Sequence, residues 1–122
     1  MSDVTETIFS RIIQREIPSD ILYEDDVCIV INDIAPQAPV HMLIIPKKPI
    51  PRLVDAVADD RSILGHLLLI AAEMARKFGV DEAFRLVINN GADAGQTVFH
   101  LHLHVLAKAA DDDGFSELDI AN

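Results

Sequence analysis

The feature that most constrains the fold is the stretch V-F-H-L-H-L-H-V-L-A at residues 98–107, in which His100, His102 and His104 alternate with aliphatic residues. An alternation of period two is typical of a β-strand, because successive side chains of a strand point to opposite faces of its sheet. We therefore expect the three imidazole side chains to project from the same face of the sheet. Imidazole titrates near neutral pH and can act as a nucleophile, acid, base or ligand, so this row also indicates chemistry.

The remaining periodicity predicts two helices and further strands, because apolar residues recur at helical spacing in two segments and β-branched runs fill several others. The order predicts an α+β domain over residues 1–108, with an antiparallel sheet of about five strands, one short helix and one long helix. Residues 109–122 are acidic and lack periodicity, so we expect a mobile C-terminal tail there. The expected elements are a helix over 7–15, strands over 21–24, 27–31 and 41–45, a helix over 59–77, and strands over 84–90 and 98–107.

Composition excludes several classes of partner. The formal net charge is −10, with 20 acidic and 10 basic residues, so a polymeric nucleic-acid partner is not expected. No apolar run approaches the roughly 20 residues that cross a bilayer, and the N-terminus lacks the pattern of a signal peptide. We therefore expect no membrane association and a location in the cytoplasm.

Two further residues have ordinary structural interpretations. Cys28 is the only cysteine and stands in an apolar run, which predicts a buried thiol and excludes a disulfide within the chain. His66 lies in the expected helix over 59–77, where a packed or surface histidine is the simplest interpretation. Residues such as Leu69 widen the apolar face of that helix beyond one stripe, so we expect a subunit interface there.

The histidine row is compatible with several kinds of chemistry. Two histidines two residues apart can share a metal ion, but on a flat strand the Cα atoms of His100 and His104 lie about 13 Å apart. One ion therefore cannot be held by all three rings. A purely structural ladder would need a partner for every buried ring. The stronger hypothesis is attack on phosphorus by the middle ring, His102, with the outer two rings supplying acid and base.

The turn that precedes the row suits a phosphoryl group. Residues 91–97 read G-A-D-A-G-Q-T. Gly95 lacks the Cβ that would obstruct close approach, and Gln96 and Thr97 offer N–H groups and side-chain donors beside the histidines. We therefore expect this turn to bind the phosphate oxygens.

These residues also resemble a known family. G-Q-T-V-F-H-L-H-L-H-V-L is similar to the histidine-triad signature of the HIT superfamily. T-I-F-S-R-I-I-Q-R-E-I-P and N-D-I-A-P-Q-A-P-V-H-M-L-I-I-P-K-K resemble its Hint branch, the histidine-triad nucleotide-binding proteins, from about Thr7 to Lys108. The resemblance implies a HIT-like fold, a homodimer, and hydrolysis of nucleoside 5′-phosphoramidates or aminoacyl adenylates through a nucleotidyl-histidine intermediate. It implies no metal and no cofactor.

The resemblance also assigns roles to individual residues. His102 matches the nucleophile, His104 and His100 match its companions, and His41 matches a fourth histidine that contacts them. Asp33 matches the carboxylate that binds the ribose hydroxyls of a purine nucleotide such as AMP or GMP. Asn89, Gly95, Gln96 and Thr97 match the positions that contact phosphate. Ile8, Phe9, Ile17, Ile31, Ile34 and Leu43 match the nucleoside pocket.

Alternatives follow from departures from the family pattern. Thr97 stands where the Hint branch commonly has Ser, and Thr is usual in the dinucleoside polyphosphate hydrolases of the same superfamily. The acidic tail replaces the C-terminal residues that shape leaving-group preference in relatives. A nucleotide-binding scaffold is the third hypothesis, motivated by the wide apolar helix and the tail. A homodimer through the long helix and the sheet edge is expected in each case.

Overall fold

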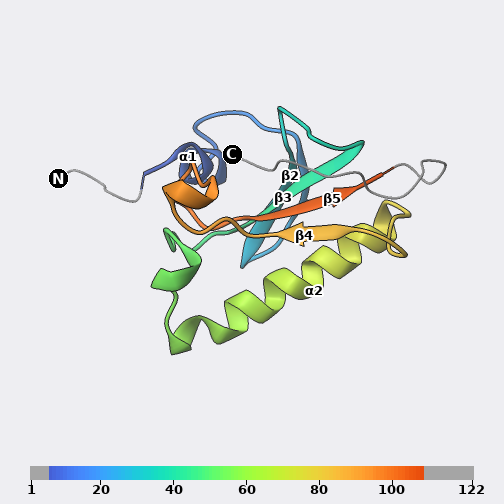
Figure 1. The fold of residues 1–122 in the computed structure, drawn as a ribbon. Helices are drawn as coiled ribbons and strands as arrows, with labels where there is room; N and C mark the ends of the chain where they lie inside the picture. Colours follow the sequence, from blue (N-terminus) through green and yellow to red (C-terminus); the bar gives the residue numbers. More distant parts are fainter. Residues whose placement is uncertain (1–5, 109–122) are drawn as a thin grey trace.

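A computed structural model describes residues 6–108 and has the α+β architecture that the sequence predicts (Figure 1). The prediction of a mobile tail over 109–122 lies outside the described residues. In chain order the elements are α1 (Ile8–Ile13), β1 (Ile21–Glu24), β2 (Cys28–Asn32), β3 (Val40–Pro46), the 3₁₀ turns η1 (Leu53–Asp55) and η2 (Ala58–Asp60), α2 (Arg61–Lys77), β4 (Arg85–Val87), η3 (Ala92–Ala94) and β5 (Leu103–Ala107).

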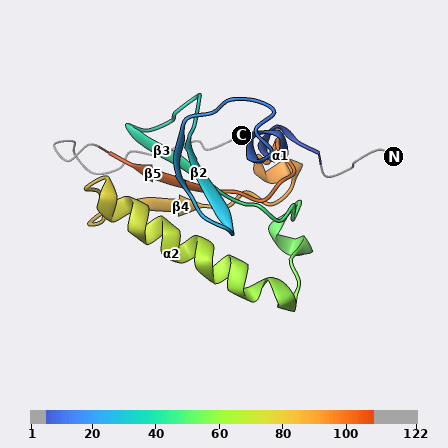
Figure 2. The ribbon, with the colours of Figure 1, turned by 180° about the vertical axis from the view of Figure 1, so that it is seen from behind.

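The five strands form one sheet in the order β1-β2-β3-β5-β4, and every neighbouring pair is antiparallel. Helix α2 runs along one face, and α1 lies against one end of the sheet on the other side (Figures 1 and 2). Strand β5 pairs with β3 on one side and β4 on the other, so its side chains lie at the middle of the sheet. The prediction of an antiparallel five-stranded sheet with a short and a long helix is confirmed.

Alternation along the strands gives the sheet two apolar layers. On the α2 side, Met42 and Ile44 of β3 pack with Leu67 and Ile70 of the helix. On the α1 side, Leu43 and its neighbours in β2 and β3 pack with α1. Leu43 is the register partner of His104, so this histidine belongs to the α1 side.

Helix α1 is shorter than the predicted helix over 7–15. Thr7 caps its start, because the Thr7 hydroxyl accepts from the Ser10 N–H at 3.2 Å and the Ser10 hydroxyl accepts from the Thr7 N–H at 2.7 Å. The helix stops at Ile13, and Arg15 adopts a left-handed φ of 65° soon after. Phe9 of this helix is buried in the apolar layer on the α1 side of the sheet.

The predicted strand over 98–107 is wrong in its first half, because β5 starts only at Leu103. The β3–β5 register pairs Leu103 with Ile44, which would put Pro46 opposite Leu101. Proline has no N–H to donate, so the ladder cannot continue there. The Leu101 N–H instead donates to the Ile50 carbonyl at 2.7 Å. His100 and His102 therefore lie in an irregular segment ahead of the strand.

Strands β2 and β3 differ from the predicted ranges by one residue at each end, and the boundaries of α2 and β4 differ by more. Helix α2 begins at Arg61, because residues 58–60 form a 3₁₀ turn in which the Asp60 carboxylate accepts from the Val57 N–H at 3.0 Å. Strand β4 covers 85–87 only, and the chain then leaves the sheet for the glycine turn. Among residues 6–108, no helix combines the length and the apolar character needed to cross a bilayer.

Candidate active site

The three rings of the histidine row gather on the α1 side of the sheet although two of them precede the strand. The centroid of the Phe9 ring in α1 is 6.3 Å from that of His100 and 4.9 Å from that of His102. The rings of His102 and His104 lie edge to face, with centroids 5.2 Å apart. All three histidines are at most 3% exposed. The three rings thus lie on one side of the sheet as expected, but ring contacts with Phe9 and with each other hold them there, because only His104 belongs to a strand.

His102 is oriented by its own chain. Its Nδ1 lies 2.7 Å from the carbonyl oxygen of His100, which can only accept, so Nδ1 carries a proton. A neutral imidazole protonated on Nδ1 has its lone pair on Nε2. The backbone therefore selects the tautomer in which Nε2 is the nucleophilic atom.

His100 supports that arrangement without being placed for proton transfer. Its Nε2–H donates to the Pro46 carbonyl at 2.7 Å, and its Nδ1 is the one buried side-chain nitrogen or oxygen in residues 6–108 without a hydrogen bond. Burial lowers the pKa of His100, which the bond to Pro46 opposes and the neighbouring His102 reinforces. The ring is accordingly a neutral anchor that fixes the carbonyl on which His102 depends.

His104 is connected to the fourth histidine. The Gln37 N–H donates to His41 Nδ1 at 3.0 Å, so the proton of a neutral His41 lies on Nε2. That Nε2 is 2.9 Å from His104 Nδ1, which therefore accepts, and the proton of a neutral His104 lies on Nε2. Burial lowers the pKa of His41, while the charge of Asp33 opposes this effect.

Asp33 lies between His41 and the nucleoside side of the site. Its Oδ2 is 3.4 Å from His41 Nε2, and its Oδ1 accepts from the Ala35 N–H at 2.8 Å. The ligand atoms of Asp33, His41 and His104 lie within 4.8 Å of one another, a spacing that could hold a metal ion. No such group in residues 6–108 joins all three members of the histidine row. That the chemistry needs no metal stays a prediction.

A cavity of about 250 Å³ is lined by residues of α1, β2 and β3 and of the segments next to them. All six residues predicted for the nucleoside pocket line it, together with Asp33 and Thr97. Phe9 both lines the cavity and touches the His102 ring, so it connects the cavity to that histidine. Five lining residues were not predicted from sequence: Ile12, Pro18, Ser19, Asn32 and Val98. Ile12 follows Phe9 by three residues on one helix face, a spacing that could have identified it.

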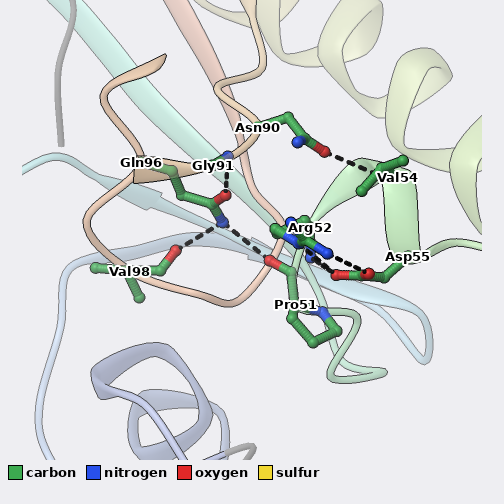
Figure 3. A network of polar contacts seen from close by, with 8 residues as sticks. All are labelled: Pro51, Arg52, Val54, Asp55, Asn90, Gly91, Gln96 and Val98. Atoms are coloured by element: carbon green, nitrogen blue, oxygen red, sulfur yellow. Dashed lines mark hydrogen bonds and ion pairs between the residues drawn. The ribbon is translucent and has the colours of Figure 1, made fainter. Parts of the chain in front are cut away.

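The glycine turn is held together by Gln96, which is 2% exposed. Its side-chain oxygen accepts from the Gly91 N–H at 2.8 Å, and its side-chain nitrogen donates to the carbonyls of Pro51 and Val98, both at 2.9 Å (Figure 3). The Gln96 N–H donates to the Gly91 carbonyl at 3.1 Å. These groups form hydrogen bonds within the protein, so the Gln96 donors that we expected to bind phosphate stabilise the turn. Thr97, by contrast, lines the pocket.

Neighbouring contacts attach the turn to the segment before α2. The Asn90 side-chain oxygen accepts from the Val54 N–H at 2.8 Å, and the Arg52 guanidinium pairs with Asp55 (Figure 3). Gly91 and Gly95 have φ values of 93° and 99°, which favour glycine at both positions. Asn89 is half-buried between β4 and the turn and does not line the cavity.

The comparison with family models assigns residues 14–111 to a family described as "HIT domain". The chain belongs to the HIT family. A HIT-like protein of Synechocystis sp. is 62% identical over 101 residues, which make up 83% of this chain and 89% of the relative. The crystal structure of a HIT family hydrolase from Legionella pneumophila matches with a TM-score of 0.82 at 42% identity, covering 84% of this chain and 92% of that one.

A histidine triad protein from Clostridium difficile also matches this HIT-family chain. Its TM-score is 0.82 at 37% identity, and the match covers 95% of this chain and 100% of that one. The chain therefore shares its family and fold with HIT family hydrolases and histidine triad proteins, which supports a hydrolase role in general. The resemblance that the sequence shows to the HIT superfamily is confirmed.

Proposed function

We propose that this HIT-family protein is a purine nucleoside phosphoramidase of the Hint type, which also hydrolyses aminoacyl adenylates. The observation that carries the proposal is the bond from His102 Nδ1–H to the His100 carbonyl, which directs the lone pair of that ring to Nε2. Phe9, which contacts this ring, also lines the cavity, and this shared neighbour supports the proposal. A nucleophile next to a cavity of nucleoside dimensions is what the reaction requires.

The first step forms a covalent intermediate. His102 Nε2 attacks the α-phosphorus, the bond from phosphorus to the leaving nitrogen breaks, and the leaving amine takes up a proton. In an aminoacyl adenylate the leaving group is a carboxylate, which needs no proton. His104 Nε2–H is the group that donates this proton, and the His41–His104 pair enters the step with one proton more than its neutral form, so that both rings are neutral after the amine has left.

The second step releases the product. Water attacks phosphorus, the bond to His102 Nε2 breaks, and a nucleoside monophosphate such as AMP or GMP leaves. His104, having given up its proton, accepts one from the attacking water. The cycle ends with both rings in their starting protonation states, and every proton is accounted for without a cofactor.

The cavity supports a purine nucleoside as the bound group. Its lining is mostly aliphatic and holds Phe9, which suits a flat aromatic base, and Asp33 at its polar end could accept from the ribose hydroxyls. The charge of −10 disfavours a polymeric nucleic acid. We expect the protein to work in the cytoplasm as a homodimer formed through α2 and the sheet edge.

A second candidate is hydrolysis of dinucleoside polyphosphates, which the presence of Thr97 in the pocket lining favours. The two activities differ only in the leaving group that His102 expels. A scaffold role, motivated by the exposed Leu68 and Leu69 on α2, would leave the same pocket able to bind nucleotide.

The test is a parallel assay of adenosine 5′-phosphoramidate and a diadenosine polyphosphate, with AMP release measured for each. We expect a higher kcat/KM for the phosphoramidate. Mass spectrometry of quenched reactions should find a nucleotidyl adduct on the peptide that contains His102, and His102→Ala should lose both turnover and adduct. Turnover at the wild-type rate in His102→Ala would reject the mechanism, and a reversed substrate order would select the second candidate.

A further inference from the structure

A cluster of three metal-binding side chains lies away from the histidine row. Asp25 stands in the turn between β1 and β2, Cys28 is the first residue of β2, and His66 lies on α2. Their ligand atoms lie within 4.8 Å of one another, and His66 Nε2 is 2.6 Å from Asp25 Oδ2. We propose that these three residues form a binding site for a thiophilic divalent transition-metal ion such as Zn²⁺.

The Asp25 carboxylate is held in position by the backbone. Its Oδ1 accepts from the N–H groups of Val27 and Cys28, both at 2.8 Å, so its Oδ2 is directed at His66 and at the Tyr23 hydroxyl, which is 2.8 Å away. Burial opposes ionisation of Asp25, but the bonds from His66, Tyr23 and the two N–H groups outweigh it and lower the pKa. The carboxylate is therefore charged and oriented before a cation arrives.

The Cys28 thiol differs from the Asp25 carboxylate, because its pKa is raised rather than lowered. It is fully buried, and burial together with the adjacent Asp25 charge raises its pKa to about 12. At neutral pH it is a thiol, which makes it a poor nucleophile and resistant to oxidation. A bound cation removes that proton, because metal ligation deprotonates a thiol outright. Because that proton must be displaced, the affinity of the site for a metal ion should increase as the pH rises.

The donor set favours zinc among the common cations. One thiolate, one imidazole nitrogen and one carboxylate oxygen are the three ligand types that Zn²⁺ takes, whereas Mg²⁺ and Ca²⁺ prefer oxygen alone. In a tetrahedral site such atoms lie about 3.5 Å apart, so a bound ion would widen the 2.6 Å gap between His66 Nε2 and Asp25 Oδ2, within the 4.8 Å spread of the three ligand atoms. Water or the Tyr23 hydroxyl is available for the fourth position.

The site is accessible and separate from the histidine row. The side chains of His66 and Asp25 are 34% and 23% exposed, so an ion can enter between α2 and the hairpin while Cys28 closes the inner end. Cys28 packs in the apolar layer on the α2 side of the sheet, whereas the row lies on the α1 side. A metal ion here would join the β1–β2 hairpin to the long helix.

The test uses untagged, metal-stripped, full-length protein titrated with Co²⁺ and with Zn²⁺. Cys28 is the only cysteine, so a thiolate-to-cobalt charge-transfer band reports this site alone. We expect one Co²⁺ per chain with that band, its displacement by Zn²⁺, and a higher Tm with zinc. His66→Gln retains a hydrogen-bond donor toward Asp25 but is a poor ligand, so it should weaken the apparent affinity at least tenfold and abolish the zinc-dependent rise in Tm.

Two comparisons complete the design. Cys28→Ser should lose the band, and circular dichroism checks its fold; if it fails to fold, His66→Gln, at a partly exposed position, decides the question alone. His104→Asn disrupts the other possible metal group, which contains no sulfur, and should leave the band unchanged. The proposal is overturned if wild-type protein gives no charge-transfer band, if His66→Gln binds like wild type, or if metal uptake is lost in His104→Asn instead.

Discussion

Replacing Gln96 by Ala tests whether the side chain holds the glycine turn together. The change removes three hydrogen bonds, to the Gly91 N–H and to the carbonyls of Pro51 and Val98. A hydrogen bond of this kind contributes about 1 kcal/mol net, and more where the abandoned partner stays dry. We therefore expect a loss of about 3 kcal/mol in the free energy of unfolding. For a chain of 122 residues, this corresponds to a fall in Tm of about 12 °C.

The assay combines urea denaturation with steady-state kinetics on adenosine 5′-phosphoramidate. Because the turn lies directly before His102, we also expect kcat/KM to fall by about 10-fold to 100-fold in the folded fraction. Asn90→Ala is the matched control, since it removes one exposed hydrogen bond to the Val54 N–H and should cost less than about 1 kcal/mol. Unchanged stability of Gln96→Ala beside a large loss of kcat would show that the amide acts on the substrate, and would refute the assignment made here.

Three further predictions concern protonation, proton transfer and assembly. Burial lowers the folded-state pKa of His41 and of His100, so the unfolded chain binds more protons than the folded chain below about pH 6.5. As the pH is lowered through this range, the free energy of unfolding should therefore fall by at most about 1.4 kcal/mol per pH unit for each ring. A urea midpoint that stays constant from pH 7 to pH 5 would contradict this. His41→Asn removes the bond to His104 Nδ1 and should lower kcat about 10-fold to 100-fold with little change in KM. Leu69 is 67% exposed on α2, so light scattering should find wild-type protein dimeric and Leu69→Lys monomeric; a wild-type monomer would reject the interface.

The sequence predicted the ends of β2 and β3 to within one residue, because their apolar and β-branched runs are buried along nearly the whole strand. Period two places His104 opposite Leu43 on the α1 side, and the long helix was recognised from its spacing. The upstream end of the row was not predictable from periodicity, because the alternation continues through His100 while the pairing stops. The cause is Pro46, which stands more than 50 positions away in the sequence and becomes relevant only once β3 and β5 are in register.

The pocket shows a second limit of sequence reasoning. Phe9 and Ile12 belong to the apolar core beneath α1 and also line the cavity, so one hydrophobic pattern serves both purposes. No feature of the pattern separates a residue that faces a neighbour from one that faces a ligand. Gln96 illustrates the same limit for polar residues, since two of its partners are local but the third, the Pro51 carbonyl, lies 45 positions away and is brought near only by the fold.

Backbone groups determine the tautomers of His41, His100 and His102, and the His41 ring determines that of His104. The His100 carbonyl holds the proton of His102 on Nδ1, the Pro46 carbonyl holds that of His100 on Nε2, and the Gln37 N–H directs that of His41 to Nε2. Substituting Pro46 does not remove the acceptor of His100, and substituting Gln37 by any residue except proline keeps the donor to His41, because these groups belong to the main chain. The imidazoles are thus identifiable from sequence, whereas their tautomers follow from where the loops bring the main chain.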